Sequence, residues 1–163
     1  MAHEIFRQTF AAKFEQAGFA AFCEAAFGRG GGMERDFGDR DILWQVALSG
    51  DALIGYAKLR PLAAPAPAPL PGAYELQQIY VRPGWHGTGA APTLMNWALR
   101  RAAELGAPEL YLTVFDDNER AKRFYRRFGF SEVGCCTFEL GGGAHDDRVW
   151  RRTLAPLGPA SGD

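Results

Sequence analysis

The sequence is poor in the features of secreted, membrane-bound and metal-binding proteins. Three cysteines among 163 residues cannot pair into the closed disulfide framework of a small secreted domain. Adjacent Cys135 and Cys136 lack the spacing of a zinc knuckle, and His3 and His145 have no metal-ligand spacing to other residues. No apolar run approaches the roughly 20 residues of a bilayer span, and the start of the chain lacks the apolar stretch of a secretory signal. We therefore expect a cytoplasmic protein with no metal and no membrane contact.

Net charge is also nearly absent. The 18 basic and 19 acidic residues sum to −1 at pH 7. Nonspecific binding of nucleic acid relies on a surplus of Lys and Arg, so we expect no nucleic-acid partner. Hydrophobic residues, by contrast, make up 47% of the chain and include 12 Phe and 4 Trp. That composition is typical of a chain that folds around a core.

Length and patterning predict one α+β domain. We place it at residues 1–155 and expect a disordered tail at 156–163. Hydrophobic spacing and the positions of Gly and Pro predict helices at 15–27, 33–37, 93–105 and 118–128, and strands at 42–48, 52–59, 74–81, 109–115, 133–140 and 148–154. This order gives a mixed, mostly antiparallel sheet with one parallel crossover at its centre.

A proline-rich tract interrupts this pattern. Five of the ten prolines lie between residues 61 and 71. Such a tract is extended and packs poorly, which is also typical of a linker between domains. Neither flank is long enough to form a good core alone, so we interpret the tract as a stiff loop between two strands.

A Gly-rich turn, HGTGAAP at residues 86–92, is a candidate phosphate site because it joins a strand to a helix. The N–H groups of a first helical turn have no intrahelical acceptor, and the helix dipole favours an anion there. The turn matches neither the Walker motif with its Lys-Ser/Thr pair nor the dinucleotide-binding glycine pattern. Taken alone, it is equally consistent with an ordinary strand–helix turn.

Three stretches around this turn carry a resemblance to a known family. They read ELQQIYV from residue 75, RPGWHGTGAAPTLM from residue 82 and YLTVFDDNERAKRFYRRFGF from residue 111. The second resembles the loop signature Gln/Arg-x-x-Gly-x-Gly/Ala. The third has the spacing N-x-x-A-x-x-F-Y-x-x-x-G-F, which starts at Asn118. From Glu75 to Phe130 the chain thus resembles the GNAT superfamily of acetyl-CoA-dependent N-acetyltransferases.

The resemblance implies a three-layer fold with a sheet between flanking helices and two central parallel strands that splay apart. The gap would take the pantetheine arm of acetyl-CoA like an inserted strand, and the Gly-rich turn would take the pyrophosphate. Asn118 would reach the pantetheine amide, and Arg127 or Arg126 the 3′-phosphate. The implied cofactor-binding residues are Ile79, Tyr80, Val81, His86, Gly87, Thr88, Gly89, Ala90, Ala91, Pro92, Asn118, Tyr125 and Arg127.

Tyr125 and Glu75 are the catalytic candidates. Tyr125 would act as the general acid that protonates the departing thiolate, although a tyrosine on an amphipathic helix is otherwise a core residue. Glu75 would take the proton of the attacking ammonium, directly or through water, and a solvated strand carboxylate is an equal alternative. Asp116 and Asp117 are interpreted as turn residues. The three cysteines are interpreted as small apolar fillers.

The implied reaction is direct attack of a primary amine on acetyl-CoA in a ternary complex, with no acyl-enzyme. GCCTFELGG and RQTFAAKF are similar to segments of the spermidine/spermine-acetyltransferase-like bacterial branch, so the expected acceptor is a small amine such as a polyamine. A peptide N-terminus or a lysine is an alternative acceptor, and a non-catalytic acetyl-CoA sensor is an alternative function. A homodimer is possible, because edge hairpins of this fold often pair.

Two features of the basic region matter for binding. His86 stands where the family has Gln or Arg, and a charged imidazole beside a pyrophosphate would make CoA affinity fall as pH rises from about 6 to 8. The cations of helix 118–128, including Lys122, are expected on a solvated face.

Overall fold

The computed structural model describes residues 3–4, 16–140 and 143–155. Its elements are α2 (Gln16–Phe27), α3 (Gly32–Phe37), β1 (Leu43–Ser49), β2 (Ala52–Pro61), β3 (Tyr74–Val81), the 3-10 helix η2 (Pro83–Trp85), α4 (Ala90–Glu104), β4 (Glu109–Phe115), α5 (Glu119–Arg127), β5 (Ser131–Leu140) and β6 (Gly143–Thr153). β3 and β4 have the predicted bounds. α4 begins earlier than predicted, because Gly89 caps it. The predicted tail, 156–163, lies outside the described residues.

The strands form one six-stranded sheet in the order β1-β2-β3-β4-β6-β5. Every neighbouring pair is antiparallel except β3 and β4, which are parallel. The α4 crossover joins these two strands, as a parallel pair requires. The predicted α+β class, with a mixed and mostly antiparallel sheet, is confirmed.

The parallel pair separates almost as soon as it forms. Tyr74 pairs with Leu110 and Glu75 with Tyr111, and the ladder between the two strands ends there. β2 holds the other edge of β3 as far as Val81, and β6 holds the other edge of β4 as far as Phe115. The facing edges of β3 and β4 beyond Glu75 therefore present backbone N–H and C=O groups without a strand partner.

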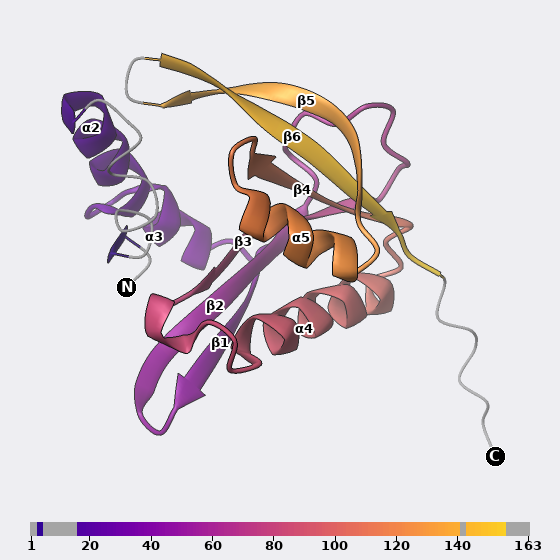
Figure 1. Cartoon of the computed structure of the whole chain (residues 1–163), viewed down its shortest axis with the longest axis horizontal. Helices are drawn as coiled ribbons and strands as arrows, with labels where there is room; N and C mark the ends of the chain where they lie inside the picture. The colour runs from indigo at the N-terminus through magenta and orange to yellow at the C-terminus, as the bar shows by residue number, and fades with distance from the viewer. Residues whose placement is uncertain (1–2, 5–15, 141–142, 156–163) are drawn as a thin grey trace.

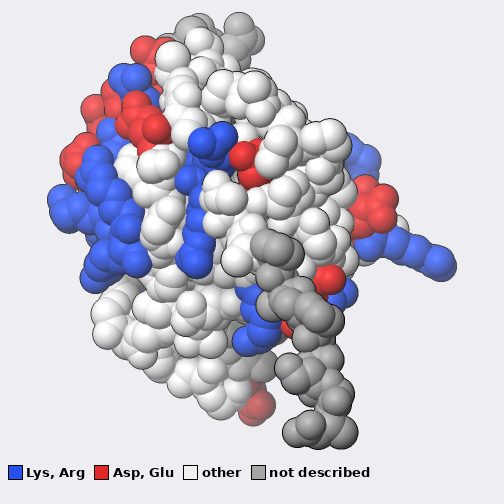
Figure 2. Space-filling model, turned by 90° about the vertical axis from the view of Figure 1, so that its right-hand side faces the viewer, with Lys and Arg blue, Asp and Glu red and all other residues white. Residues whose placement is uncertain are grey.

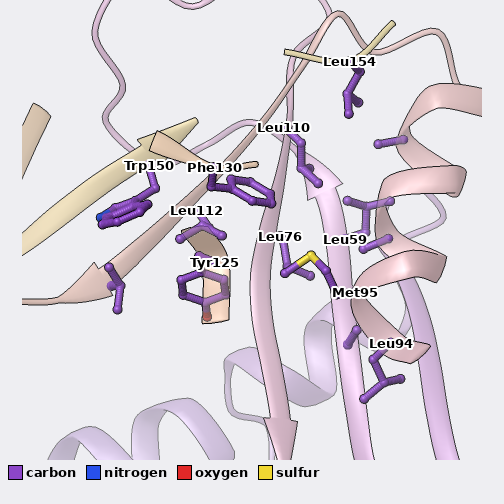
Figure 3. Packing of buried hydrophobic residues seen from close by; sticks show 14 of the residues in the cluster. Leu59, Leu76, Leu94, Met95, Leu110, Leu112, Tyr125, Phe130, Trp150 and Leu154 are labelled. Carbon is purple, nitrogen blue, oxygen red and sulfur yellow. The ribbon is translucent and has the colours of Figure 1, made fainter. Parts of the chain in front are cut away.

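Helices cover both faces of the sheet, with α2 and α3 on one face and α4 and α5 on the other (Figure 1). The main core lies between the sheet and α4 and α5. Leu94 and Met95 of α4 are buried against Leu59 and Leu76 of the sheet, and Figure 3 shows the Met95 sulfur beside Leu76. Because α4 buries residues three and four positions apart, its charged side chains remain outside.

The connection between β2 and β3, residues 62–73, is the proline-rich segment. It packs on the opposite face of β4 and β6. Ala73 is buried with Tyr111 and Val149, and Leu62 and Ala66 of the segment pack against this small cluster. Alternation along β4 explains the two cores, because Leu110 and Leu112 face the main core while Tyr111 faces the proline-rich segment.

The face shown in Figure 2 carries basic and acidic side chains in adjacent groups, separated by wide areas with neither. Basic and acidic side chains therefore lie next to one another on this face, in keeping with the near-zero net charge of the chain. Within the described part of the chain, no helix is long and apolar enough to cross a membrane.

Candidate active site

A cleft of about 960 Å³ opens where β3 and β4 separate. Leu76 to Val81 of β3 and Leu112 to Phe115 of β4 line its two sides. The predicted site residues that line the cleft are Glu75, Ile79, Tyr80, Val81, His86, Gly87, Gly89, Ala91, Pro92, Asn118, Tyr125 and Arg127. Thr88 and Ala90 are not among the lining residues, and the Thr88 hydroxyl instead donates to the Trp85 carbonyl at 2.8 Å.

The Gly-rich turn has the geometry of an anion site. Gly89 is the N-cap of α4, and its φ of 93° lies in the left-handed region that favours glycine. No side chain caps this helix start. The N–H groups of the first turn therefore lack intrahelical acceptors and can donate to a ligand in the cleft. Pro92 is the third helical residue and withholds only its own donor.

α5 brings three predicted residues to the cleft. The Asn118 side-chain oxygen caps the helix by accepting from the Ala121 N–H at 3.2 Å, which leaves its amide NH₂ as a donor. Arg127 lines the cleft beside Phe124, whereas the Arg126 guanidinium lies over the Trp150 ring at 5.0 Å. Of the two arginines considered for the 3′-phosphate, only Arg127 faces the cleft.

Tyr125 lies at the boundary of cleft and core. Its ring packs in the main core with its centroid 6.2 Å from that of Phe130, and Figure 3 shows the hydroxyl pointing away from Leu112 and Phe130. Burial raises the pKa of Tyr125 to about 12. The phenol is therefore neutral at physiological pH and keeps its proton available as a hydrogen-bond donor.

Glu75 lines the cleft but is held by the protein's own donors. Its side chain is 3% exposed. One carboxylate oxygen, Oε2, accepts from the backbone N–H of Ala63 at 3.3 Å and of Ala64 at 2.7 Å. The other, Oε1, lies 3.8 Å from Arg60 Nε. Among the described residues none donates a hydrogen bond to Oε1, which leaves this oxygen able to accept a proton.

Three charged residues lining the cleft were missed by the sequence analysis. Lys58 of β2 is buried and pairs with Asp36 of α3. Asp147 of β6 sits in register with Phe115 and Cys136, near enough for its charge to add to the effect of burial in raising the pKa of Tyr80. No motif marks these residues, because only the fold brings their three separate elements, β2, α3 and β6, to one cleft.

The sequence interpretation of Lys122 is wrong. Lys122 is 6% exposed and not on a solvated face, because Asp116 accepts from it at 2.7 Å and Glu119 at 3.2 Å. Asp116 lies in the predicted turn, and it also accepts from Arg148 of β6 at 2.7 Å. These hydrogen bonds hold the pKa of Asp116 far below its usual range.

The cysteines differ from one another. Cys23 is buried as expected of an apolar filler, but Cys135 is exposed and Cys136 lines the cleft. Burial, and next the charge of Asp147, raises the pKa of Cys136. A neutral thiol is a weak nucleophile, which disfavours an acyl-enzyme on this residue. Among the described residues, no group of three or more His, Cys, Asp or Glu side chains is placed to hold a metal ion.

Comparison with known proteins gives a single family. The model of the GNAT acetyltransferase family matches residues 1–130, which is most of the chain. The chain belongs to the GNAT acetyltransferase family. The family assignment made from the three motif stretches is thereby confirmed, and so is the fold that it implies.

Similar GNAT proteins are found among curated sequences and solved structures. An uncharacterised N-acetyltransferase of Mycobacterium tuberculosis is 46% identical over 80 residues, which cover 49% of this chain and 51% of that protein. The chain thus matches about half the length of such relatives. The PaiA N-acetyltransferase of Thermoplasma acidophilum in complex with coenzyme A has a TM-score of 0.72 at 20% identity, over 94% of this chain and 88% of that one. Nourseothricin acetyltransferase has a TM-score of 0.61 at 26% identity, over 72% and 68%.

The GNAT loop of this chain departs from the family signature at His86, and the structure shows what the imidazole does. His86 Nδ1 lies 2.7 Å from Arg120 NH1, and His86 Nε2 lies 3.0 Å from the Val81 carbonyl oxygen. Arginine can only donate and a carbonyl can only accept, so Nδ1 accepts and Nε2 carries the hydrogen. This arrangement engages both ring nitrogens and ties α5 to the end of β3, whereas the sequence predicts an imidazole that becomes charged beside a bound pyrophosphate.

Proposed function

We propose that this protein transfers an acetyl group from acetyl-CoA to the primary amine of a small molecule. One observation carries the proposal. The β3–β4 ladder ends after two pairs, and the resulting gap has a capless helix N-terminus at one end and the Tyr125 hydroxyl beside it. A gap between parted strands accepts an extended chain, a helix N-terminus accepts a phosphate, and a phenol donates a proton.

The residues of the cleft fit acetyl-CoA along its whole length. Backbone groups of Ile79, Tyr80 and Val81 on the free edge of β3 would pair with the pantetheine amides. The N–H groups of residues 87–91 would bind the pyrophosphate, and Arg127 would meet the 3′-phosphate. The amide NH₂ of Asn118 is a further donor on the pantetheine side. The complex of a similar fold with coenzyme A supports this placement.

The chemistry follows from the position of Tyr125. The amine nitrogen attacks the thioester carbonyl carbon, the C–N bond forms and the C–S bond breaks. Tyr125 stabilises the sulfur by donating its phenolic hydrogen bond as negative charge develops there. Its pKa of about 12 is higher than that of an ordinary thiol, near 8.5. The phenol therefore keeps its proton and stabilises the departing thiolate as a neutral hydrogen-bond donor, and the thiolate takes its proton from solvent.

The attacking amine must also lose a proton, because an ammonium has no lone pair. Glu75 is the base proposed from the sequence, and Asp147 is a second carboxylate that lines the cleft. A base at either position would lie on the acceptor side of the thioester. The pH dependence of Glu75 and Asp147 variants separates the two, because only the residue that accepts the proton moves the acidic limb of the profile.

Turnover with an amine panel tests the proposal. Purified protein is incubated with acetyl-CoA and small amines, polyamines, or peptides with a free N-terminus or lysine, and thiol release is followed. We expect release that depends on a small amine. Release with peptides alone would indicate the peptide acceptor. No release with any amine, alongside a thermal shift by acetyl-CoA, would indicate a non-catalytic sensor. At a hundredfold excess over Kd, that shift corresponds to about 2.7 kcal/mol.

A further inference from the structure

The acceptor end of the cleft is a slot between two apolar walls. One wall comes from α2 and α3 and includes Phe27 and Met33. The other is the start of the proline-rich segment, where Ala63, Ala64 and Pro65 line the cleft. The elements of the first wall lie across the face of the sheet opposite α4 and α5 (Figure 1). An acceptor that reaches the thioester from this side has to pass between the walls.

A buried carboxylate fixes the proline-rich wall. Glu75 Oε2 accepts from the N–H groups of both Ala63 and Ala64. At the far end of the same segment, Glu109 Oε2 accepts from the Leu70 N–H at 3.0 Å. Proline lacks an N–H and restricts its own φ, so a segment rich in proline has few donors and little freedom. Glu75 and Glu109 together accept from three of the remaining N–H groups and so hold the segment near both of its ends.

A second carboxylate fixes the opposite wall. Asp36 of α3 accepts a hydrogen bond from the Lys58 ammonium of β2. The Lys58 side chain is 3% exposed, and its ammonium lies 5.2 Å from the centre of the Trp44 ring. A lysine buried to this degree needs a paired anion. Asp36 therefore anchors α3 to the sheet and is not free to take up a second positive charge.

These contacts limit which acceptors fit. We propose, on the basis of the proposed function, that the acceptor is a primary amine with one positive charge on an apolar body. Glu75 is then a positioning residue for the wall that contacts this body. Of the three carboxylates lining the cleft, Asp36 and Glu75 accept hydrogen bonds from the chain, and Asp147 also interacts with another group of the chain. A second ammonium along the slot would be desolvated between apolar walls and close to the Lys58 charge. The slot therefore disfavours a polyamine.

Two amines of equal chain length test this directly. Heptylamine and 1,6-diaminohexane differ only in whether the far end is a methyl or an ammonium group. We expect kcat/KM for heptylamine to exceed that for the diamine by about tenfold or more, because a desolvated charge is costly. Spermidine should be poorer than heptylamine as well. Equal values, or a preference for the diamine or spermidine, overturn the inference while leaving the proposed function intact. No turnover with any of these amines, with acetyl-CoA still bound, contradicts the proposed function and the inference with it.

Lys58→Met sharpens the test because it releases Asp36. The freed carboxylate would face the slot, so the ratio of heptylamine to diamine kcat/KM should fall several-fold. We expect kcat and KM for the amines to change, and the affinity for acetyl-CoA to stay as in wild type. An unchanged ratio in a folded variant would show that Asp36 does not face the acceptor, which overturns this part of the inference.

Glu75 and Glu109 separate a positioning role from a role in proton transfer. Glu75→Gln keeps an oxygen for the Ala63 and Ala64 N–H groups, so it should retain the acceptor preference and the pH profile. Glu75→Ala and Glu109→Ala should both weaken the preference and both speed hydrogen exchange at the Ala64 and Leu70 amides. Glu109 is the matched control, because it holds the same segment from outside the cleft. A Glu75→Gln variant with a shifted acidic limb, next to a silent Glu109→Ala, would identify a base and overturn the positioning role.

Discussion

The two ends of the cleft are built in different ways. The proposed coenzyme end consists of backbone: the free edge of β3, the N–H groups of the Gly-rich turn and the start of α4. The proposed acceptor end consists of side chains from separate elements, with Lys58 paired to Asp36 and Glu75 holding Ala63 and Ala64. Backbone geometry depends on a few glycines and a helix start, and it can remain the same while side chains vary. The difference explains how one fold can keep its coenzyme and change its acceptor.

The largest effect is expected from a substitution at Gly89, which lies at the proposed coenzyme end of the cleft. In Gly89→Asp, a carboxylate would face the pyrophosphate and a φ of 93° would have to be held by a non-glycine residue. We expect the stabilisation by acetyl-CoA, about 2.7 kcal/mol at a hundredfold excess over Kd, to disappear. Thermal melts with and without ligand measure it.

Two controls separate charge from backbone strain at this position. Gly89→Asn has nearly the same shape without the charge, and asparagine tolerates the left-handed region. Gly106, at a φ of 75° after the same helix and outside the cleft lining, receives the same Asp substitution. Retained stabilisation in Gly89→Asp would mean that the phosphate lies elsewhere.

Tyr125→Phe should affect chemistry and leave binding alone. Removing the phenolic donor is expected to lower kcat by about a hundredfold, the low end for a positioned acid, with acetyl-CoA affinity near the wild-type value. Tyr111→Phe is the control, because Tyr111 is also buried and its hydroxyl donates to Glu109 on the other face of the sheet. Full turnover of Tyr125→Phe with chemistry rate-limiting would make Tyr125 a packing residue.

The attachment of α5 is tested at Asp116, which joins Lys122 of α5 to Arg148 of β6. The pKa of Asp116 is lowered in the folded protein, first by the hydrogen bond from Arg148. Its contribution to stability is therefore present above the unfolded pKa, near 3.9, and is lost as pH falls below it. Asp116→Asn should lower the melting temperature by a few degrees at pH 7. The difference from wild type should narrow below about pH 4, and a difference that is constant with pH would contradict the charged role.

The smallest expected effect concerns His86. Because both ring nitrogens are engaged, by Arg120 and by the Val81 carbonyl, we expect these contacts of His86 to be the same with and without CoA. The affinity–pH curves of wild type and His86→Gln should then run parallel from about pH 6 to 8. The 3′-phosphate titrates in both proteins and cancels in the comparison. A wild-type affinity that falls relative to the variant, by up to about 1 kcal/mol, would show that the bound pyrophosphate charges the imidazole.

The residues of the proposed coenzyme end could be predicted from the sequence, because each group of them lies within a short stretch of the chain. The strand 74–81, the glycines of residues 87–89 and the motif from Asn118 each lie within a short stretch, and spacing alone predicts their geometry. The residues of the proposed acceptor end could not be predicted, because Lys58, Asp36 and Asp147 line the same cleft only after the chain has folded. Lys122 was misplaced for the same reason, since its partner Asp116 and the neighbouring Arg148 are brought together by β6.

The central claim is that the acetyl group passes directly from acetyl-CoA to an amine held in the acceptor slot. Mass spectra of the protein and of the small molecules, taken through the first turnover with acetyl-CoA and heptylamine, test it most directly. Direct transfer predicts N-acetylheptylamine and free CoA in equal amounts, with the protein mass unchanged at every time point. A protein acetylated on Cys136, which forms first and decays as the amide appears, would contradict direct transfer.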